Sequence, residues 1–76
     1  MNQFTVYSIE HHGSSVFTRR ITANTFSSFE KGRLYAIKLA EKLASLHNET
    51  VEMTATGLKF GNKEYLVCKV LPFDVH

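Results

Sequence analysis

The sequence predicts a small α+β domain in which one amphipathic helix packs on one face of an antiparallel sheet, in the order ββαββ. Between about Ser28 and His47, apolar residues recur every three to four positions, which is the period of an α-helix. On either side of that segment, short runs rich in β-branched and aromatic residues are separated by turn residues, which is typical of β-hairpins. The chain has 76 residues without repeats or a linker, so we expect a single domain, residues 1–76.

The N-terminal part predicts the first hairpin. Residues Asn2–Ile9 are rich in β-branched and aromatic types and indicate a strand. The next segment, Glu10–Ser15, contains Gly13 and indicates a turn. Val16–Ile21 then forms the returning strand, and Thr22–Phe26 connects it to the helix.

The start of the helix is marked by a capping-box spacing, because Glu30 follows Ser27 by three residues. The Ser27 hydroxyl can accept the backbone N–H of Glu30, whose carboxylate also suits the positive end of the helix dipole. Asn48 tolerates left-handed backbone geometry, so we expect the helix to end there.

The helix has one apolar face, which we expect to cover the core. Small residues at a spacing of four along that face would let the helix axis lie close to a sheet. Leu34 lies on the polar side and Ile37 lies at the border of the two faces. The residues expected on the apolar face are Phe29, Gly32, Ala36, Leu39, Ala40, Leu43 and Leu46, with Tyr35 beside them.

The C-terminal part predicts two more strands. Glu49–Thr56 alternates between polar and apolar residues and indicates a strand. Leu58–Phe60 continues it, Gly61-Asn62 indicates a two-residue hairpin turn, and Lys63–Leu71 returns. Pro72 ends the ladder because proline has no N–H.

Composition limits the function classes. Cys68 is the one cysteine, so no internal disulfide forms, and a reducing, cytoplasmic compartment is expected. Because Leu66, Cys68 and Val70 alternate onto one face, we expect the thiol to lie in the core. No apolar stretch approaches the roughly 20 residues that span a bilayer, so no membrane partner is expected. The net charge of +2 neither requires nor excludes nucleic acid.

The residues that carry chemistry are scattered, so we expect no enzyme, no metal and no cofactor. His11 and His12 are adjacent, and neighbouring side chains on an extended segment point in opposite directions. Ser14-Ser15 lacks the strand–turn–helix context of a nucleophile. His47 is expected to be half-buried or to cap the helix.

One helix covers one face of the sheet, and both faces carry apolar groups. We expect the uncovered face to bind another protein or a second copy, and the alternative is ordinary exposed apolar surface. The residues expected to contact a partner there are Tyr7 and Ile9 from the first strand and Tyr65 and Val67 from the last. Leu34, ringed by charged residues on the helix, is a further candidate contact.

A small RNA- or DNA-binding protein is the alternative function. Arg19 and Arg20, which are also candidate partner contacts, lie near Phe17, Tyr7 and Tyr65. Arginine beside aromatic rings can neutralise phosphates and stack on bases. On one strand, however, the two arginines point to opposite faces, so at most one joins any patch.

The hairpin strand VFTRRI and the capped helix segment YAIKLAEKL give the chain a hairpin–helix–hairpin order that resembles small accessory proteins of large tailed phages. Several of those proteins inhibit host defence systems. The resemblance implies a protein that acts in the host cytoplasm by binding and occluding a macromolecule.

Overall fold

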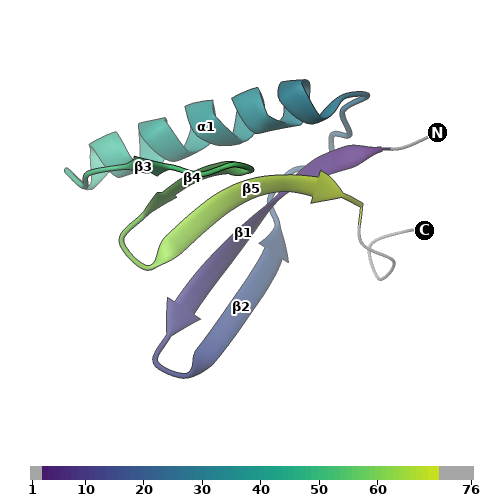
Figure 1. Ribbon diagram of the computed structural model, residues 1–76. Coiled ribbons are helices and arrows are strands. Elements are labelled where there is room, and N and C mark those ends of the chain that lie inside the picture. The colour runs from purple at the N-terminus through teal and green to yellow at the C-terminus, as the bar shows by residue number, and fades with distance from the viewer. Residues whose placement is uncertain (1–2, 71–76) are drawn as a thin grey trace.

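Five antiparallel strands form one sheet, and a single helix crosses one face of it, in the computed structural model that describes residues 3–70 (Figure 1). The sheet order is β2-β1-β5-β4-β3. This arrangement confirms the predicted α+β class with the helix on one face. The elements are β1 (Phe4–His12), β2 (Ser15–Arg20), α1 (Phe29–Leu46), β3 (Glu52–Met53), β4 (Gly57–Phe60) and β5 (Lys63–Lys69).

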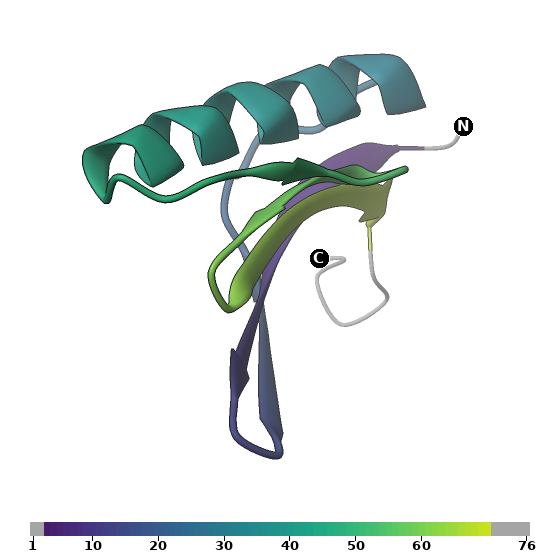
Figure 2. The same cartoon turned by 60° about the vertical axis from the view of Figure 1, so that its left-hand side comes forward.

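The first and last strands, β1 and β5, pair in the middle of the sheet. Their ladder runs from Phe4 opposite Lys69 to Glu10 opposite Lys63. The N-terminal hairpin extends the sheet on one side as β2, and the C-terminal strands extend it on the other. In the turned view the β1–β2 hairpin projects away from the helix, which lies over the opposite part of the sheet (Figure 2).

The C-terminal region holds three strands where two were predicted. The expected strand Glu49–Thr56 is wrong in extent, because only Glu52–Met53 pairs with β4. A tight turn follows, in which the Thr54 N–H donates to the Gly57 carbonyl over 2.9 Å and the Gly57 N–H donates to the Thr54 hydroxyl over 2.9 Å. The chain therefore reverses before β4. The predicted Gly61-Asn62 turn is confirmed between β4 and β5.

The helix begins one residue later than its predicted cap. Ser28, not Ser27, is the N-cap: its backbone is extended, and its hydroxyl accepts the N–H of Lys31 over 3.3 Å. Glu30 still lies in the first turn, where its charge favours the helix dipole. At the other end Asn48 has a left-handed φ of 54°, as expected.

A ridge of small residues brings α1 against the sheet. Gly32, Ala36, Ala40 and Ala44 are all buried. At Gly32 a β-carbon would overlap the Val67 side chain on β5, so only glycine permits this approach. The core between helix and sheet consists of Val6, Ala36, Ile37, Ala40, Ala44, Leu58, Phe60 and Tyr65.

The buried face of the helix is rotated relative to the predicted one. Ile37, expected at the border, is buried, whereas Leu46, expected in the core, is 70% exposed. The reason is that the ridge continues through Ala44, which places Leu46 on the opposite side of the last turn. His47 caps the helix through its backbone N–H, as one alternative held, but its side chain is exposed rather than half-buried.

We expect Gly32→Ala to destabilise the protein by about 1 kcal/mol, because overpacking against Val67 costs roughly 1–3 kcal/mol and the gain in helix propensity offsets about 1 kcal/mol. In a Val67→Ala background the same substitution should stabilise the protein by up to about 1 kcal/mol, since the overlapping methyl is gone. Urea unfolding of the four variants measures the coupling. Equal effects of Gly32→Ala in both backgrounds would contradict the close approach.

Candidate interaction surface

The ladder between β1 and β5 decides which side chains share a face. Tyr7 pairs with Leu66, and Ser8 pairs with Tyr65. Paired residues lie on the same face of a sheet. Tyr7 and Ile9 therefore lie on the outer face, away from α1, as expected for the uncovered face.

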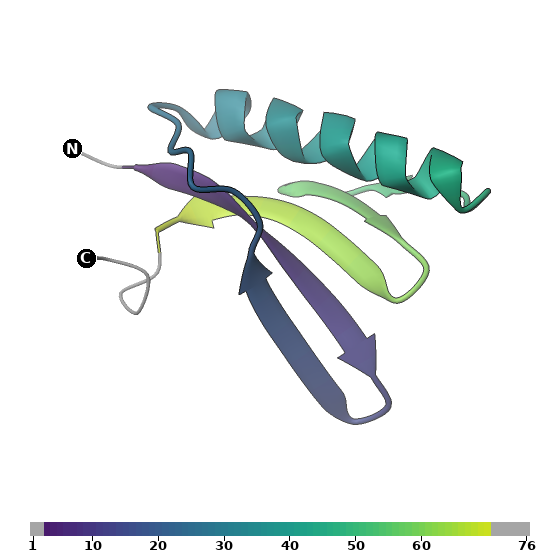
Figure 3. The same ribbon diagram turned by 180° about the vertical axis from the view of Figure 1, so that it is seen from behind.

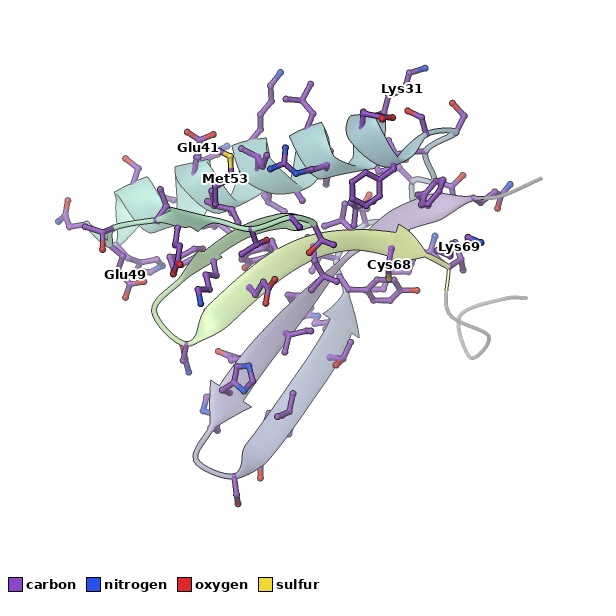
Figure 4. All side chains as sticks on the ribbon, in the orientation of Figure 1. Lys31, Glu41, Glu49, Met53, Cys68 and Lys69 are labelled. Atoms are coloured by element: carbon purple, nitrogen blue, oxygen red, sulfur yellow. The ribbon has the colours of Figure 1, made fainter. Side chains whose placement is uncertain are left out.

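Tyr65 and Val67 lie on the helix side, so their assignment as partner contacts is wrong. Tyr65 is 8% exposed and belongs to the core, where its ring stacks on Phe60 with centroids 5.9 Å apart. Val67 is 1% exposed and lies against Gly32. The same register turns Leu66 and Cys68 outward, so Cys68 is not in the core beneath the helix. Figure 4 shows the Cys68 side chain pointing away from α1.

The part of the outer face formed by β1 presents little apolar surface. Tyr7 is 1% exposed, and Thr5 is fully buried where its hydroxyl donates to the Asn24 carbonyl over 2.9 Å. Ile9 is half-buried. Towards β3 the face becomes charged, with Lys59 paired to Glu52 over 3.3 Å. The structure therefore does not present a broad apolar interface across this face.

The connection after β2 explains why one end of the outer face is closed. Phe26 returns to pair with Phe4 in an isolated bridge, which leaves Thr22–Thr25 as a bulging loop beside β1 (Figure 3). Arg20 holds this loop, because its guanidinium donates to the carbonyls of Thr22 over 2.9 Å and Ala23 over 3.4 Å. Arg20 is thus engaged within the chain, which argues against its assignment as a partner contact.

Strand β2 is the most exposed element of the sheet. Five of its six residues are exposed, and Val16 and Phe17, on opposite faces, are 55% and 58% exposed. The strand pairs with β1 on one side, and the described part of the chain places no strand on its other side. Arg19 is also exposed, without a hydrogen bond or an ion pair to any described residue.

The backbone groups along the open edge of β2 can be identified. The Ile21 N–H donates to the Val6 carbonyl over 3.2 Å, so Ile21 and Val6 form a hydrogen-bonded pair of the ladder. Such pairs alternate along antiparallel strands, which directs the polar groups of Arg19, Phe17 and Ser15 towards β1. The N–H and C=O groups of Val16, Thr18 and Arg20 consequently point outward.

A shallow depression of about 320 Å³ lies beside this strand on the helix-side face. Its rim contains an ion-pair cluster in which Glu10 accepts from His12 over 3.2 Å and lies 3.6 Å from the Lys63 ammonium. The hydrogen bond from His12, followed by the charge of Lys63, lowers the pKa of the Glu10 carboxyl below its ordinary value of 4.5. The residues around the depression are Ser8, Glu10, Phe17, Arg19, Ile21, Lys63 and Tyr65.

The remaining surfaces give weaker candidates. Leu34 is 53% exposed on the outer side of α1, where it was predicted. A second depression of about 380 Å³ lies near the β4–β5 turn, beside His11, whose N–H donates to the Asn62 carbonyl over 2.9 Å. Within residues 3–70 no three His, Cys, Asp or Glu side chains gather as a metal site would require, and no helix is long and apolar enough to cross a membrane.

The open edge runs along β2, and sequence reasoning did not select its residues Val16 or Thr18 as contacts. Val16 and Phe17 are adjacent apolar residues, so one lies on each face of the strand. This pair is the sequence signal that could have marked both faces of the strand as apolar. Its position at the edge of the sheet follows from the β1–β5 pairing, which no local pattern reveals.

We expect the pKa of Glu10, measured by NMR titration of its side chain, to lie below 4.5 and to rise in His12→Ala. Because the folded-state pKa is depressed, the stability that Glu10 contributes is present above its unfolded pKa and is lost as the pH falls through the folded value. The acid-induced loss of hairpin stability should accordingly shrink in Glu10→Gln. An unchanged Glu10 titration in His12→Ala would contradict this arrangement.

The sequence matches no protein-family model, and comparison with curated proteins and with solved structures gives no significant match. The geometry of β2 and its surroundings is therefore the basis for assigning a function.

Proposed function

We propose that the protein is a non-enzymatic protein-binding module that receives an extended strand along the open edge of β2. The observation that carries this proposal is a six-residue edge strand that pairs with β1 on one side only and exposes Val16 and Phe17 on its two faces. In strand addition, backbone hydrogen bonds supply affinity and contacts of alternate side chains supply specificity. Here the outward N–H and C=O groups of Val16, Thr18 and Arg20 would supply the affinity. The exposed side chains would supply the specificity.

The edge lacks the features that usually discourage pairing. Natural sheets protect their edges with short strands, proline, lysine or bulges. Strand β3, at the opposite edge, spans only two residues and is protected by its short length. Strand β2 spans Ser15–Arg20 and contains neither proline nor lysine. Only its C-terminal arginines place charge along it, so the part around Val16 and Phe17 is open to a partner strand.

The resemblance to phage accessory proteins supports a finer proposal. A partner strand on β2 would be held by backbone contacts that need no catalytic group, and binding alone would occlude the partner's own surface. We accordingly place the action of the protein in the host cytoplasm, with a host defence or regulatory protein as the occluded target.

Site-specific photo-crosslinking tests where protein binding occurs. With p-benzoylphenylalanine at position 17, we expect crosslinks to protein in host cells, because the Phe17 side chain is exposed beside the edge. The same probe at Leu34, which is similarly exposed on the helix, is the matched control and should give few crosslinks. Gel mobility and mass spectrometry identify the crosslinked species.

A backbone variant separates strand addition from side-chain contact. Thr18→Pro removes an outward N–H and leaves the ladder to β1 intact, since proline is tolerated at edge positions whose N–H faces solvent. We expect crosslinking from position 17 to be lost in this variant while the circular dichroism spectrum is retained. Crosslinks that persist in Thr18→Pro, or that form equally well from Leu34, would refute binding at the edge.

Nucleic-acid binding is the second candidate, favoured by the depression beside β2. Phe17, Arg19 and Lys63 line this depression, where an aromatic ring can stack on a base and the two cations can neutralise phosphates. Three observations weaken this function: Tyr65 is buried, Tyr7 lies on the opposite face, and Glu10 pairs with Lys63. The cationic surface left for phosphate is small.

Fluorescence anisotropy with labelled single- and double-stranded oligonucleotides tests this alternative. We expect no binding that depends steeply on salt, because few phosphates could be neutralised. Binding at low salt that weakens in Arg19→Ala, but not in the control Lys42→Ala on the exposed side of α1, would make nucleic acid the ligand instead.

A further inference from the structure

We propose that the strand received by β2 is β2 of a second copy, paired antiparallel about a twofold axis through Thr18. This inference rests on the proposed function, because it uses the same edge, and it names the occupant and the register. It follows from the backbone pattern, from the distribution of charge along β2 and from the open surroundings of the hairpin.

The backbone pattern restricts the register. In an antiparallel ladder between two copies, residues whose backbone N–H and C=O groups point outward must lie opposite each other. These residues alternate along β2. The twofold axis therefore passes through a residue and not between two residues. An axis through Arg19 or Arg20 would set like charges directly opposite each other, which is destabilising. An axis through Ser15 or Val16 would pair the strand with turn residues near Gly13.

Two axes remain, through Phe17 and through Thr18. An axis through Phe17 pairs Arg20 with Ser14, which lies in the turn. An axis through Thr18 pairs Ser15 with Ile21, and Ile21 is still extended and bonded to Val6. The second register therefore keeps the whole of β2 in the new ladder, with Thr18 opposite its own symmetry mate.

The same register makes the side chains complementary. On the helix-side face each Arg19 lies opposite Phe17 of the other copy, in a pair that is not hydrogen-bonded and therefore has close side chains. The guanidinium, which has no ion-pair partner in the described chain, can then lie against an aromatic ring. The incoming Phe17 ring also reaches the rim of the depression that Arg19, Ile21 and Tyr65 line.

On the outer face each Arg20 lies opposite Val16 of the other copy. Its guanidinium is held by the carbonyls of Thr22 and Ala23, so its charge is directed to its own loop rather than to its symmetry mate. Both exposed apolar residues of β2 thus gain a neighbour. The hairpin extends beyond α1 in two views, so a second hairpin can approach β2 from its open side (Figures 1 and 2).

Sedimentation velocity across a concentration series tests the dimer. We expect the native chain to shift from monomer to dimer and Thr18→Lys to remain monomeric, because it places two ammonium groups opposite each other at the axis. Ser45→Lys adds the same charge on the exposed side of α1 and should dimerise like the native chain. A native chain that stays monomeric at millimolar concentration, or equal dimerisation of both variants, would overturn the proposal.

Disulfide trapping tests the register, in a Cys68→Ser background. In the proposed dimer, paired Thr18 positions have Cα atoms about 5.5 Å apart, which a disulfide can bridge. Two Phe17 positions are diagonal neighbours, roughly 7–8 Å apart, which is beyond the usual range. Thr18→Cys should therefore oxidise to a covalent dimer faster than Phe17→Cys or the control Ser45→Cys, and the opposite order would overturn the register.

The two proposals fail in distinguishable ways. A monomeric native chain whose position-17 probe crosslinks to a different protein removes the dimer and leaves the protein-binding module in place. A chain that neither dimerises nor crosslinks from position 17 removes both. A dimer that Thr18→Lys disrupts, with crosslinks from position 17 to a second copy of the chain, supports strand addition at β2 and the dimer, and removes a host protein as the occupant of this edge.

Discussion

The pairing of β1 with β5 is the constraint on which the rest of the structure depends. Residues near the two ends of the chain meet in this ladder, with Val6 opposite Val67 one pair from its centre. Both valines are buried, and α1 packs over this pair through Gly32. The helix could not lie this close if the ladder were displaced, because a shift of one residue would turn Val67 to the outer face.

This central position of β1 and β5 also determines where the sheet is left uncovered. The helix packs chiefly against β5, β4 and β1, and the outer hairpin lies beyond its reach. Strand β2 therefore contributes almost nothing to the core, although it is six residues long. An element that contributes so little to the core, and that exposes apolar side chains on both faces, is the reason for proposing that this strand contacts another chain.

The sequence predicted the elements that depend on local chemistry. The periodicity of the helix, the left-handed Asn48 and the turn at Gly61-Asn62 are properties of neighbouring residues, and the structure contains all three. The cap was misplaced by one residue because Ser27 and Ser28 are both competent caps. Choosing between them depends on how the chain enters the helix after Phe26 pairs with Phe4.

The candidate site was harder to predict, because it depends on pairing between distant residues. In β5 both alternating sets are apolar, Tyr65 with Val67 and Leu66 with Cys68, so hydrophobicity alone does not tell which set faces the helix. The distinction comes from Gly32, which accommodates Val67. Tyr7 and Tyr65 were accordingly grouped as one surface although the register places them on opposite faces.

The unequal edges of the sheet bear on what kind of assembly the chain can form. An open edge at each end would let copies add without limit, because every added strand would present a new edge. Here β2 is long and open, whereas β3 pairs over Glu52–Met53 alone and carries the Glu52–Lys59 ion pair. Pairing through β2 about a twofold axis uses the same edge on both copies, so it closes after two. The outermost strands of such a ten-stranded sheet would be the two short β3 strands, which offer little for a third copy to pair with.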